Sequence, residues 1–253
     1  MPPEQSTDRS TQPRLGVLAL GDSITNGGGE LQWGVALQSW ALWVARGLGR
    51  PFTGYAVDGN RVTDVVRQQV PAVLERGAGA EARYDLGCLY IGVNDVRAFD
   101  WDPESFDREY RRVLRFLAER CDRVLAVTAP LDLGRPRAGG KVRGMNALIE
   151  RAAADHGALA LDLSDFRGRN LMMADHVHPT AFGQIAIAER ALDLLAAAGM
   201  RVVARPSRLI FYETTWWKRL RGDSTYAYRH LKVSARALAL TLWFSFSGPR
   251  SRR

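Results

Sequence analysis

The sequence predicts an α/β fold, a three-layer α/β/α sandwich around a mostly parallel sheet of about five strands. Short runs of apolar residues alternate with amphipathic stretches of ten or more residues, and several of the apolar runs end in glycine and small polar residues. Strands that alternate with helices favour βαβ units with right-handed crossovers. Such units build a parallel sheet that helices cover on both faces.

Each predicted element follows from its hydrophobic pattern. The strands are expected at residues 15–20, 53–57, 85–91, 123–128 and 158–163. The helices are expected at residues 35–48, 62–75, 103–119, 141–156 and 180–198. The second helix should be bent or interrupted near Pro71, because proline lacks the backbone N–H that a helix interior requires.

Charge divides the chain into unequal parts. The 253 residues are 46% hydrophobic, which is enough for one sizeable core. The net charge is +8, but residues 201–253 hold twelve Lys and Arg against two acids, so the rest of the chain is slightly acidic. We therefore expect a disordered lead-in at 1–14, one domain at 15–200 and a basic, aromatic-rich extension at 201–253. This asymmetry favours an anionic partner for the extension and argues against nucleic-acid binding by the domain.

The first residues and the cysteines indicate a compartment. Residues 1–14 lack the apolar core of a signal peptide. Cys88 and Cys121 lie in apolar runs and are expected to be buried free thiols, as in a reducing environment. Neither has a His or Cys at metal-ligand spacing, and no metal or other cofactor is expected. The sequence thus predicts a cytoplasmic protein. Peripheral contact with the inner face of the membrane is an alternative that the sequence leaves open.

The basic extension leaves two interpretations open. Trp216 and Trp217 precede a cluster of cations, and residues 233–246 are nearly uncharged. This second stretch is shorter than the ~20 residues that cross a bilayer as a helix. Residues 208–253 could form an interfacial anchor on anionic lipid. They could equally form a helix that packs on the domain or on a second copy of the chain.

Polar residues with catalytic potential follow the predicted strands. Ser23 comes directly after the strand at 15–20, and Gly59 and Asn94 follow the next two strands. The carboxyl ends of parallel strands form the ligand-binding edge of such a sheet. Ser23 is therefore a candidate nucleophile, although serine is also common in turns and at helix N-caps.

Acyl transfer from an ester also needs a base, a group that orients the base, and donors for the oxyanion. Asp175 and His178 are three residues apart just before the last helix, so one turn could hold the carboxylate beside the imidazole. His176, between them, is expected to point elsewhere in a structural or solvent-facing role.

Four motifs in order carry a family resemblance. They are Gly21-Asp22-Ser23-Ile24, Gly59, Gly92-Val93-Asn94-Asp95 and Asp175-His176-Val177-His178-Pro179. With these motifs residues 15–198 resemble the SGNH hydrolase superfamily, the GDSL-type esterases and lipases. Two departures are Ile24 in place of leucine, and Gly54 where an asparagine often precedes the second motif.

The resemblance implies a flavodoxin-like fold and assigns roles to the motif residues. Ser23 would be the nucleophile, His178 the general base and Asp175 its orienting carboxylate. The backbone N–H groups of Ser23 and Gly59 and the side-chain amide of Asn94 would form the oxyanion hole. Asp22 and Asp95 have no chemical step in this scheme and are expected to hold their turns by hydrogen bonds.

The expected activity is hydrolysis of a small-molecule or lipid carboxylic ester through an acyl-enzyme on Ser23. Two alternatives use the same residues, an O-acyltransferase and a carbohydrate acetylesterase. A catalytically silent module that the basic extension recruits to membranes is less favoured, because every catalytic position is filled. Four apolar residues near the strand ends could line an acyl pocket or belong to the core: Leu31, Trp33, Phe99 and Trp101.

Overall fold

Five parallel strands form the single sheet of the described chain. The computed structural model describes residues 14–76, 82–133 and 138–247, so the predicted lead-in lies outside it except for Arg14. The strands are β1 (Val17–Gly21), β2 (Phe52–Gly54), β3 (Tyr84–Tyr90), β4 (Cys121–Val127) and β5 (Leu159–Leu161). Their order is β2-β1-β3-β4-β5, with every neighbouring pair parallel. The predicted fold class and strand number are confirmed.

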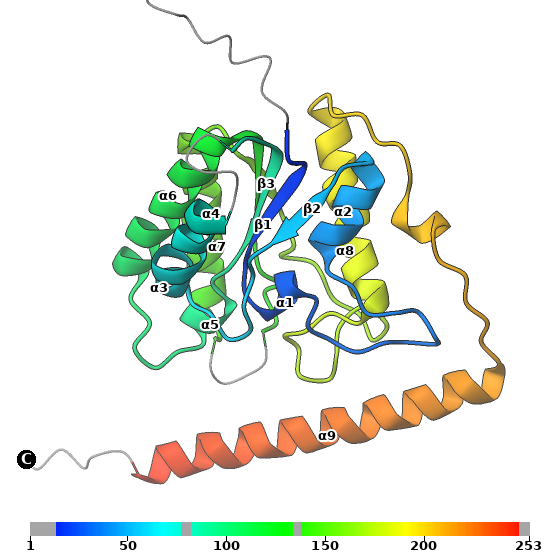
Figure 1. The fold of residues 1–253 in the computed structure, drawn as a ribbon. Helices are drawn as coiled ribbons and strands as arrows, with labels where there is room; N and C mark the ends of the chain where they lie inside the picture. Colours follow the sequence, from blue (N-terminus) through cyan, green and yellow to red (C-terminus); the bar gives the residue numbers. More distant parts are fainter. Residues whose placement is uncertain (1–13, 77–81, 134–137, 248–253) are drawn as a thin grey trace, which may run out of the picture.

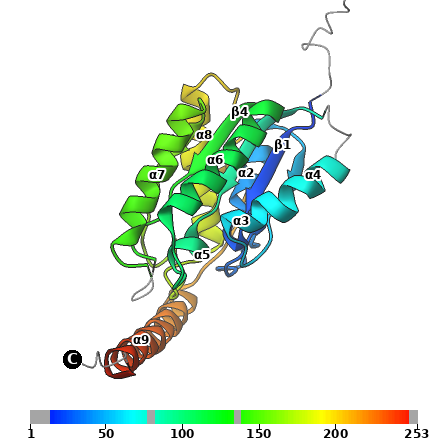
Figure 2. The same ribbon diagram turned by 90° about the vertical axis from the view of Figure 1, so that its left-hand side faces the viewer.

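Helices cover both faces of this sheet (Figures 1 and 2). One face carries α2 (Trp40–Leu48) and α8 (Ala181–Ala197), which pack on each other. The other face carries α3 (Val62–Asp64), η1 (Val65–Gln69), α4 (Val70–Arg76), α6 (Pro103–Arg120) and α7 (Lys141–Asp155). Two short helices begin just after strands β1 and β3, namely α1 (Ser23–Asn26) and α5 (Val93–Val96).

The strands at the centre of the sheet are buried on both faces. All five residues of β1 are buried, and in β3 only Asp85 is partly exposed. Burial on both faces explains why these strands read as continuous apolar runs rather than as an alternating pattern. Cys88 and Cys121 are both buried and free, as predicted.

Two predicted helices differ from the observed ones. The helix expected at 35–48 begins only at Trp40, because the Ser39 side chain accepts a hydrogen bond from the Ala41 N–H and caps the helix there. The predicted interruption near Pro71 is a π-helical turn, η1, one turn before the proline. α4 then continues through Pro71, which lies in its first turn, where a missing N–H is tolerated.

The basic extension forms a long helix at the carboxyl edge of the sheet. A short 3₁₀ helix, η2 (Pro206–Arg208), comes first, and α9 spans Trp216–Ser247, 32 residues or about 48 Å. α9 begins well before the uncharged stretch at 233–246 and crosses below α1 and α5 (Figure 1). Within the described residues, no helix combines the length and the apolar character that crossing a bilayer requires.

Two helical glycines allow a matched test of packing. A Cβ on Gly183, in the first turn of α8, would lie 1.9 Å from the Leu171 carbonyl oxygen, whereas a Cβ on Gly144 in α7 would meet nothing within 4 Å. We expect Gly183→Ala to lower the free energy of unfolding by about 1–3 kcal/mol. Gly144→Ala should raise it by about 0.5–1 kcal/mol, because alanine loses less backbone entropy in a helix. Urea unfolding followed by circular dichroism measures both, and a stable Gly183→Ala protein would contradict the close contact.

Candidate active site

A helix cap places Ser23 at the carboxyl end of β1. The Asp22 carboxylate accepts a hydrogen bond from the Ile24 N–H at 3.0 Å and so begins α1 with Ser23 as its first residue. α1 ends after one turn at Gly27, whose φ of 94° is in the left-handed region. The Ser23 backbone N–H therefore belongs to an open helix N-terminus, where backbone donors lack intrahelical partners.

A tight turn before α8 holds Asp175 against His178. One oxygen of Asp175 accepts the backbone N–H groups of Val177 at 2.9 Å and His178 at 3.0 Å. Its other oxygen lies 2.7 Å from His178 Nδ1. The carboxylate thus fixes both the backbone and the imidazole of the residue three positions away.

Ser23 and His178 meet although 155 residues separate them in sequence. Ser23 Oγ lies 2.9 Å from His178 Nε2. Hydroxyl, imidazole and carboxylate therefore form one hydrogen-bonded chain, with the imidazole and the carboxylate about one third exposed. This is the geometry in which an imidazole can remove a hydroxyl proton while a carboxylate orients it.

His176 lies outside this chain, as the sequence predicted. Its φ of 60° turns the backbone within the tight loop. Its Nδ1 lies 2.9 Å from Asp132 Oδ2, and its Nε2 lies 3.2 Å from Nδ1 of His230 on α9. His176 therefore links the His178 loop to α9.

The loops that carry Gly59 and Asn94 are also joined. The Asn94 side-chain amide donates to the Asn60 carbonyl oxygen at 2.9 Å. Gly59 has a φ of 78°, a left-handed conformation that favours glycine. Asn26, at the end of α1, donates to the Asp58 carboxylate at 2.9 Å. Hydrogen bonds thus connect the three loops that carry the expected oxyanion donors to one another.

Two buried glutamines, which sequence reasoning missed, hold the loop after β1. Gln69 accepts from the Gly21 N–H at 3.0 Å and donates to the Gly21 and Asn60 oxygens at 2.7 Å each. Gln184 donates to the carbonyl oxygens of Ile24 and Gly28 and accepts from the Trp40 N–H. Both glutamines lie among apolar residues of predicted helices. That position could have indicated their role, because a buried amide requires hydrogen-bond partners.

The pKa values of His178 and Asp175 move apart. The hydrogen bond that the His178 ring donates to Asp175 raises the pKa of His178 above its usual value, and it outweighs the burial of the ring, which acts in the opposite direction. Burial alone would raise the pKa of Asp175, but the hydrogen bonds from the His178 ring and from two backbone N–H groups lower it. Asp175 therefore remains ionised while His178 titrates.

Two further carboxyl groups are buried nearby: Asp22 holds its own turn, as predicted, whereas Asp95 binds the first residue of α3 instead of its own turn. Burial raises the pKa of Asp22 to about 7 and that of Asp95 to about 6. Asp22 caps α1, and both Asp95 oxygens lie 3.2 Å from the Val62 backbone nitrogen, which donates to them. Among the residues that the structure describes, no group of three His, Cys, Asp or Glu side chains could hold a metal ion.

Three of the four candidate pocket residues line two separate cavities. Leu31 and Trp33 line a cavity between α9 and the domain. Trp101 lines a smaller cavity beside Arg61 and Asp95. Its ring packs on Phe106, with 5.2 Å between the ring centroids. Phe99 is 80% exposed. The four side chains do not line a single cavity.

Comparison with known proteins identifies the family. The profile of the GDSL-like lipase/acylhydrolase family matches residues 19–186, which include all four motifs. The chain belongs to this family. It is accordingly a carboxylic ester hydrolase of the acylhydrolase class, as the sequence motifs indicated. A search of curated proteins gave no match.

Solved structures with the same fold extend the comparison. LAE5, an α/β hydrolase enzyme from the metagenome of Lake Arreo in Spain, is 20% identical, with a TM-score of 0.57 over 72% of this chain and 94% of its own. Axe2, an acetylxylan esterase from Geobacillus stearothermophilus, is 18% identical, with a TM-score of 0.57 over 75% and 97%. The acetyl xylan esterase AlAXEase is 24% identical, with a TM-score of 0.54 over 73% and 99%. At these identities the likeness establishes the fold.

The pairing of Asp175 with His178 predicts a pKa change that needs no substrate. We expect Asp175→Asn to lower the pKa of the His178 ring, because the largest cause of its upward shift is removed while its burial remains. Asp58→Asn is the matched control. Asp58 raises the same pKa through charge alone and contributes less than Asp175, so the shift should be smaller. NMR titration of the ring measures both values, and equal shifts would contradict a direct hydrogen bond.

Proposed function

We propose that the chain hydrolyses carboxylic esters through an acyl-enzyme on Ser23. The observation that carries this proposal is the chain of two short contacts, 2.9 Å from Ser23 Oγ to His178 Nε2 and 2.7 Å from His178 Nδ1 to Asp175. His178 removes the hydroxyl proton as Ser23 attacks the ester carbonyl carbon. It then donates that proton to the leaving alcohol.

The oxyanion of the tetrahedral intermediate needs donors that are in place before the reaction. We assign this role to the backbone N–H groups of Ser23 and Gly59 and to the Asn94 amide. The hydrogen bond from Asn94 to the Asn60 carbonyl supports the assignment, because it orients the amide and leaves its second N–H for the oxyanion. Water activated by His178 then cleaves the acyl-enzyme and regenerates Ser23.

Substitution of the proposed catalytic residues tests the mechanism, with His176 as a control. On a p-nitrophenyl ester, Ser23→Ala and His178→Gln should each lower kcat by roughly 10⁴-fold or more. Asn94→Ala should lower it by about 10²–10³-fold, the usual cost of one oxyanion donor. His176→Gln is the control and should retain activity, since His176 contacts Asp132 and His230 instead of Ser23.

Labelling and pH dependence add independent readouts. A fluorophosphonate should attach to Ser23, as located by mass spectrometry, and a silent binding module would not react there. kcat/KM should rise with pH through the pKa of His178, which lies above that of an ordinary histidine, because His178 accepts a proton only when it is neutral. A flat profile from acid to neutral pH would contradict a histidine base.

Product analysis separates hydrolysis from acyl transfer. With water as acceptor, the free acid should form at the rate of alcohol release even when sugar or glycerol acceptors are added. Transfer of most acyl groups to such an acceptor would identify an O-acyltransferase instead. A strong preference for acetylated sugars in the same assay would favour a carbohydrate acetylesterase, the activity named for two of the structural neighbours.

We further propose that α9 contacts anionic lipid at the inner face of the membrane. Trp217, Leu220, Tyr228 and Leu231 are 42–70% exposed and share one side of the helix at about 100° per residue. The opposite side, including Asp223 and His230, contacts the domain. Basic residues flank the apolar side, an arrangement typical of interfacial helices.

Vesicle sedimentation tests this contact. The intact chain should bind vesicles that contain phosphatidylglycerol more strongly than pure phosphatidylcholine vesicles, and added salt should weaken binding. Trp217→Ser/Leu231→Ser should reduce binding at least about tenfold, given the apolar area removed. Phe211→Ser, which removes an 86% exposed aromatic side chain outside α9, is the control. A dimer in solution that the double variant dissociates would overturn the proposal and assign this side to a second copy.

A further inference from the structure

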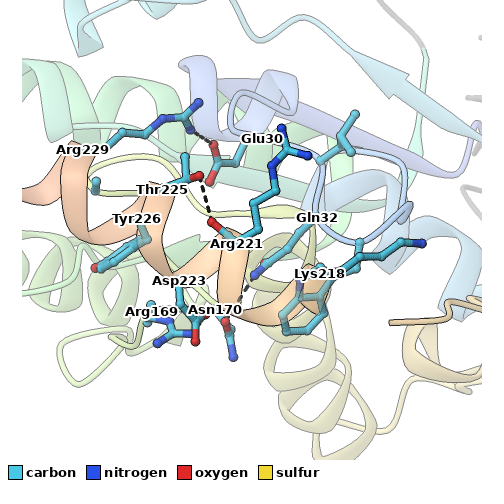
Figure 3. A pocket seen from close by; sticks show the side chains of 14 residues that line it. Glu30, Gln32, Arg169, Asn170, Lys218, Arg221, Asp223, Thr225, Tyr226 and Arg229 are labelled. Atoms are coloured by element: carbon cyan, nitrogen blue, oxygen red, sulfur yellow. Dashed lines mark hydrogen bonds and ion pairs between the residues drawn. The ribbon is translucent and has the colours of Figure 1, made fainter. Parts of the chain in front are cut away.

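A cavity between α9 and the domain is lined in part by the loop that leads into Asp175 and His178. It has a volume of about 570 Å³ and lies between one side of α9 and the loops at 30–33 and 169–174 (Figure 3). Ala174, which lines it, directly precedes Asp175. The carbonyl oxygen of Glu30, another lining residue, accepts from the Ala181 N–H at 2.9 Å, just after the His178 loop. A molecule in this cavity would therefore lie beside the loop that holds His178.

The charges in this cavity do not balance. Four cationic side chains line it, and two of them are already matched by the acids that line it. Arg229 lies 2.5 Å from Glu30, and Arg169 pairs with Asp223. Lys218 and Arg221 form no ion pair among the described residues, and Figure 3 shows both on the side of α9 that borders the cavity. The lining thus has two positive charges without a matching negative charge.

Two uncompensated cations suit a doubly charged anion. A phosphate monoester carries −1.5 to −2 charges near pH 7. Arginine offers a planar fork of N–H donors and lysine a point charge, both of which are common phosphate ligands. The Asn170 side chain, which also lines the cavity, adds a neutral N–H donor, because its amide oxygen already accepts from Gln32. A neutral alcohol would leave the two charges unmatched.

We propose that this cavity binds a phosphate group on the alcohol part of the ester, with Lys218 and Arg221 as the specificity-determining residues. The proposal rests on the proposed esterase function and narrows its substrate class to phosphorylated alcohols. The phosphate would lie between α9 and the loop at 30–33, with the ester carbonyl directed toward Ser23.

Two substrates that differ only in the phosphate test the proposal. We compare kcat/KM for 1-butyryl-glycerol and 1-butyryl-glycerol 3-phosphate in the full chain. The ratio should favour the phosphorylated ester, and Lys218→Ser/Arg221→Ser should lower that ratio at least about tenfold, since charge-assisted hydrogen bonds are lost. Both side chains are exposed, so the double variant should fold normally.

The matched control removes the same total charge elsewhere. Arg201→Ser/Arg208→Ser deletes two exposed arginines that do not line the cavity, and its substrate ratio should equal that of the unmodified chain. A ratio that falls equally in both double variants would indicate a long-range field and overturn the site. An unchanged ratio in Lys218→Ser/Arg221→Ser would overturn it as well.

A binding measurement separates this proposal from the esterase function. Calorimetric titration with glycerol 3-phosphate needs no turnover, and the affinity should fall at least about tenfold in Lys218→Ser/Arg221→Ser but not in the control. Inorganic phosphate that binds more tightly than glycerol 3-phosphate would indicate a free-anion site and overturn the role in substrate recognition. Binding of glycerol 3-phosphate by a chain inactive on all esters would instead refute the esterase function alone.

Discussion

The loop after β1 depends on one constraint, namely that its buried backbone groups must be hydrogen-bonded without help from water. Gln69 binds both the N–H and the carbonyl of Gly21, and Gln184 binds the carbonyls of Ile24 and Gly28. Each glutamine comes from a different face of the sheet, so the loop is held from both sides. Gln184 lies on α8, the helix that follows His178. Its side-chain amide therefore connects the Ser23 loop to the element that carries the end of the His178 loop.

Parallel topology explains why residues so distant in sequence meet. Each strand delivers its following loop to the same edge of the sheet, and β1 lies between β2 and β3. The loops with Ser23, Gly59 and Asn94 are therefore neighbours by strand order alone. The turn with Asp175 and His178 follows the last strand and reaches this edge through the packing of α8 on α2.

Sequence patterns predicted the sheet, the parallel direction of its strands and the short-range geometry of the candidate site. Those features follow from apolar runs, glycines at strand ends and the three-residue spacing of Asp175 and His178, all of which are local. The sequence pattern predicts a start for α2 that is too early, because the residues at 35–39 follow a helical spacing. The helix begins only after Ser39, whose side chain caps it, and the hydrophobic pattern does not show this cap. Gln69 was missed because its partners, Gly21 and Asn60, become neighbours only in the folded chain. The position of α9 likewise depends on long-range ion pairs, such as the one between Arg229 and Glu30.

The π-helical turn η1 fixes the direction in which Gln69 points. A π turn holds one residue more than an α-helical turn, and each residue of an α-helix advances the side-chain direction by about 100°. Removal of a single residue from Val65–Gln69 would rotate the amide away from Gly21 and leave two buried backbone groups unsatisfied. We therefore expect an insertion or deletion in this segment to disturb the Ser23 loop more than one in a surface loop, although no residue of the segment belongs to the hydrogen-bonded chain of Ser23, His178 and Asp175.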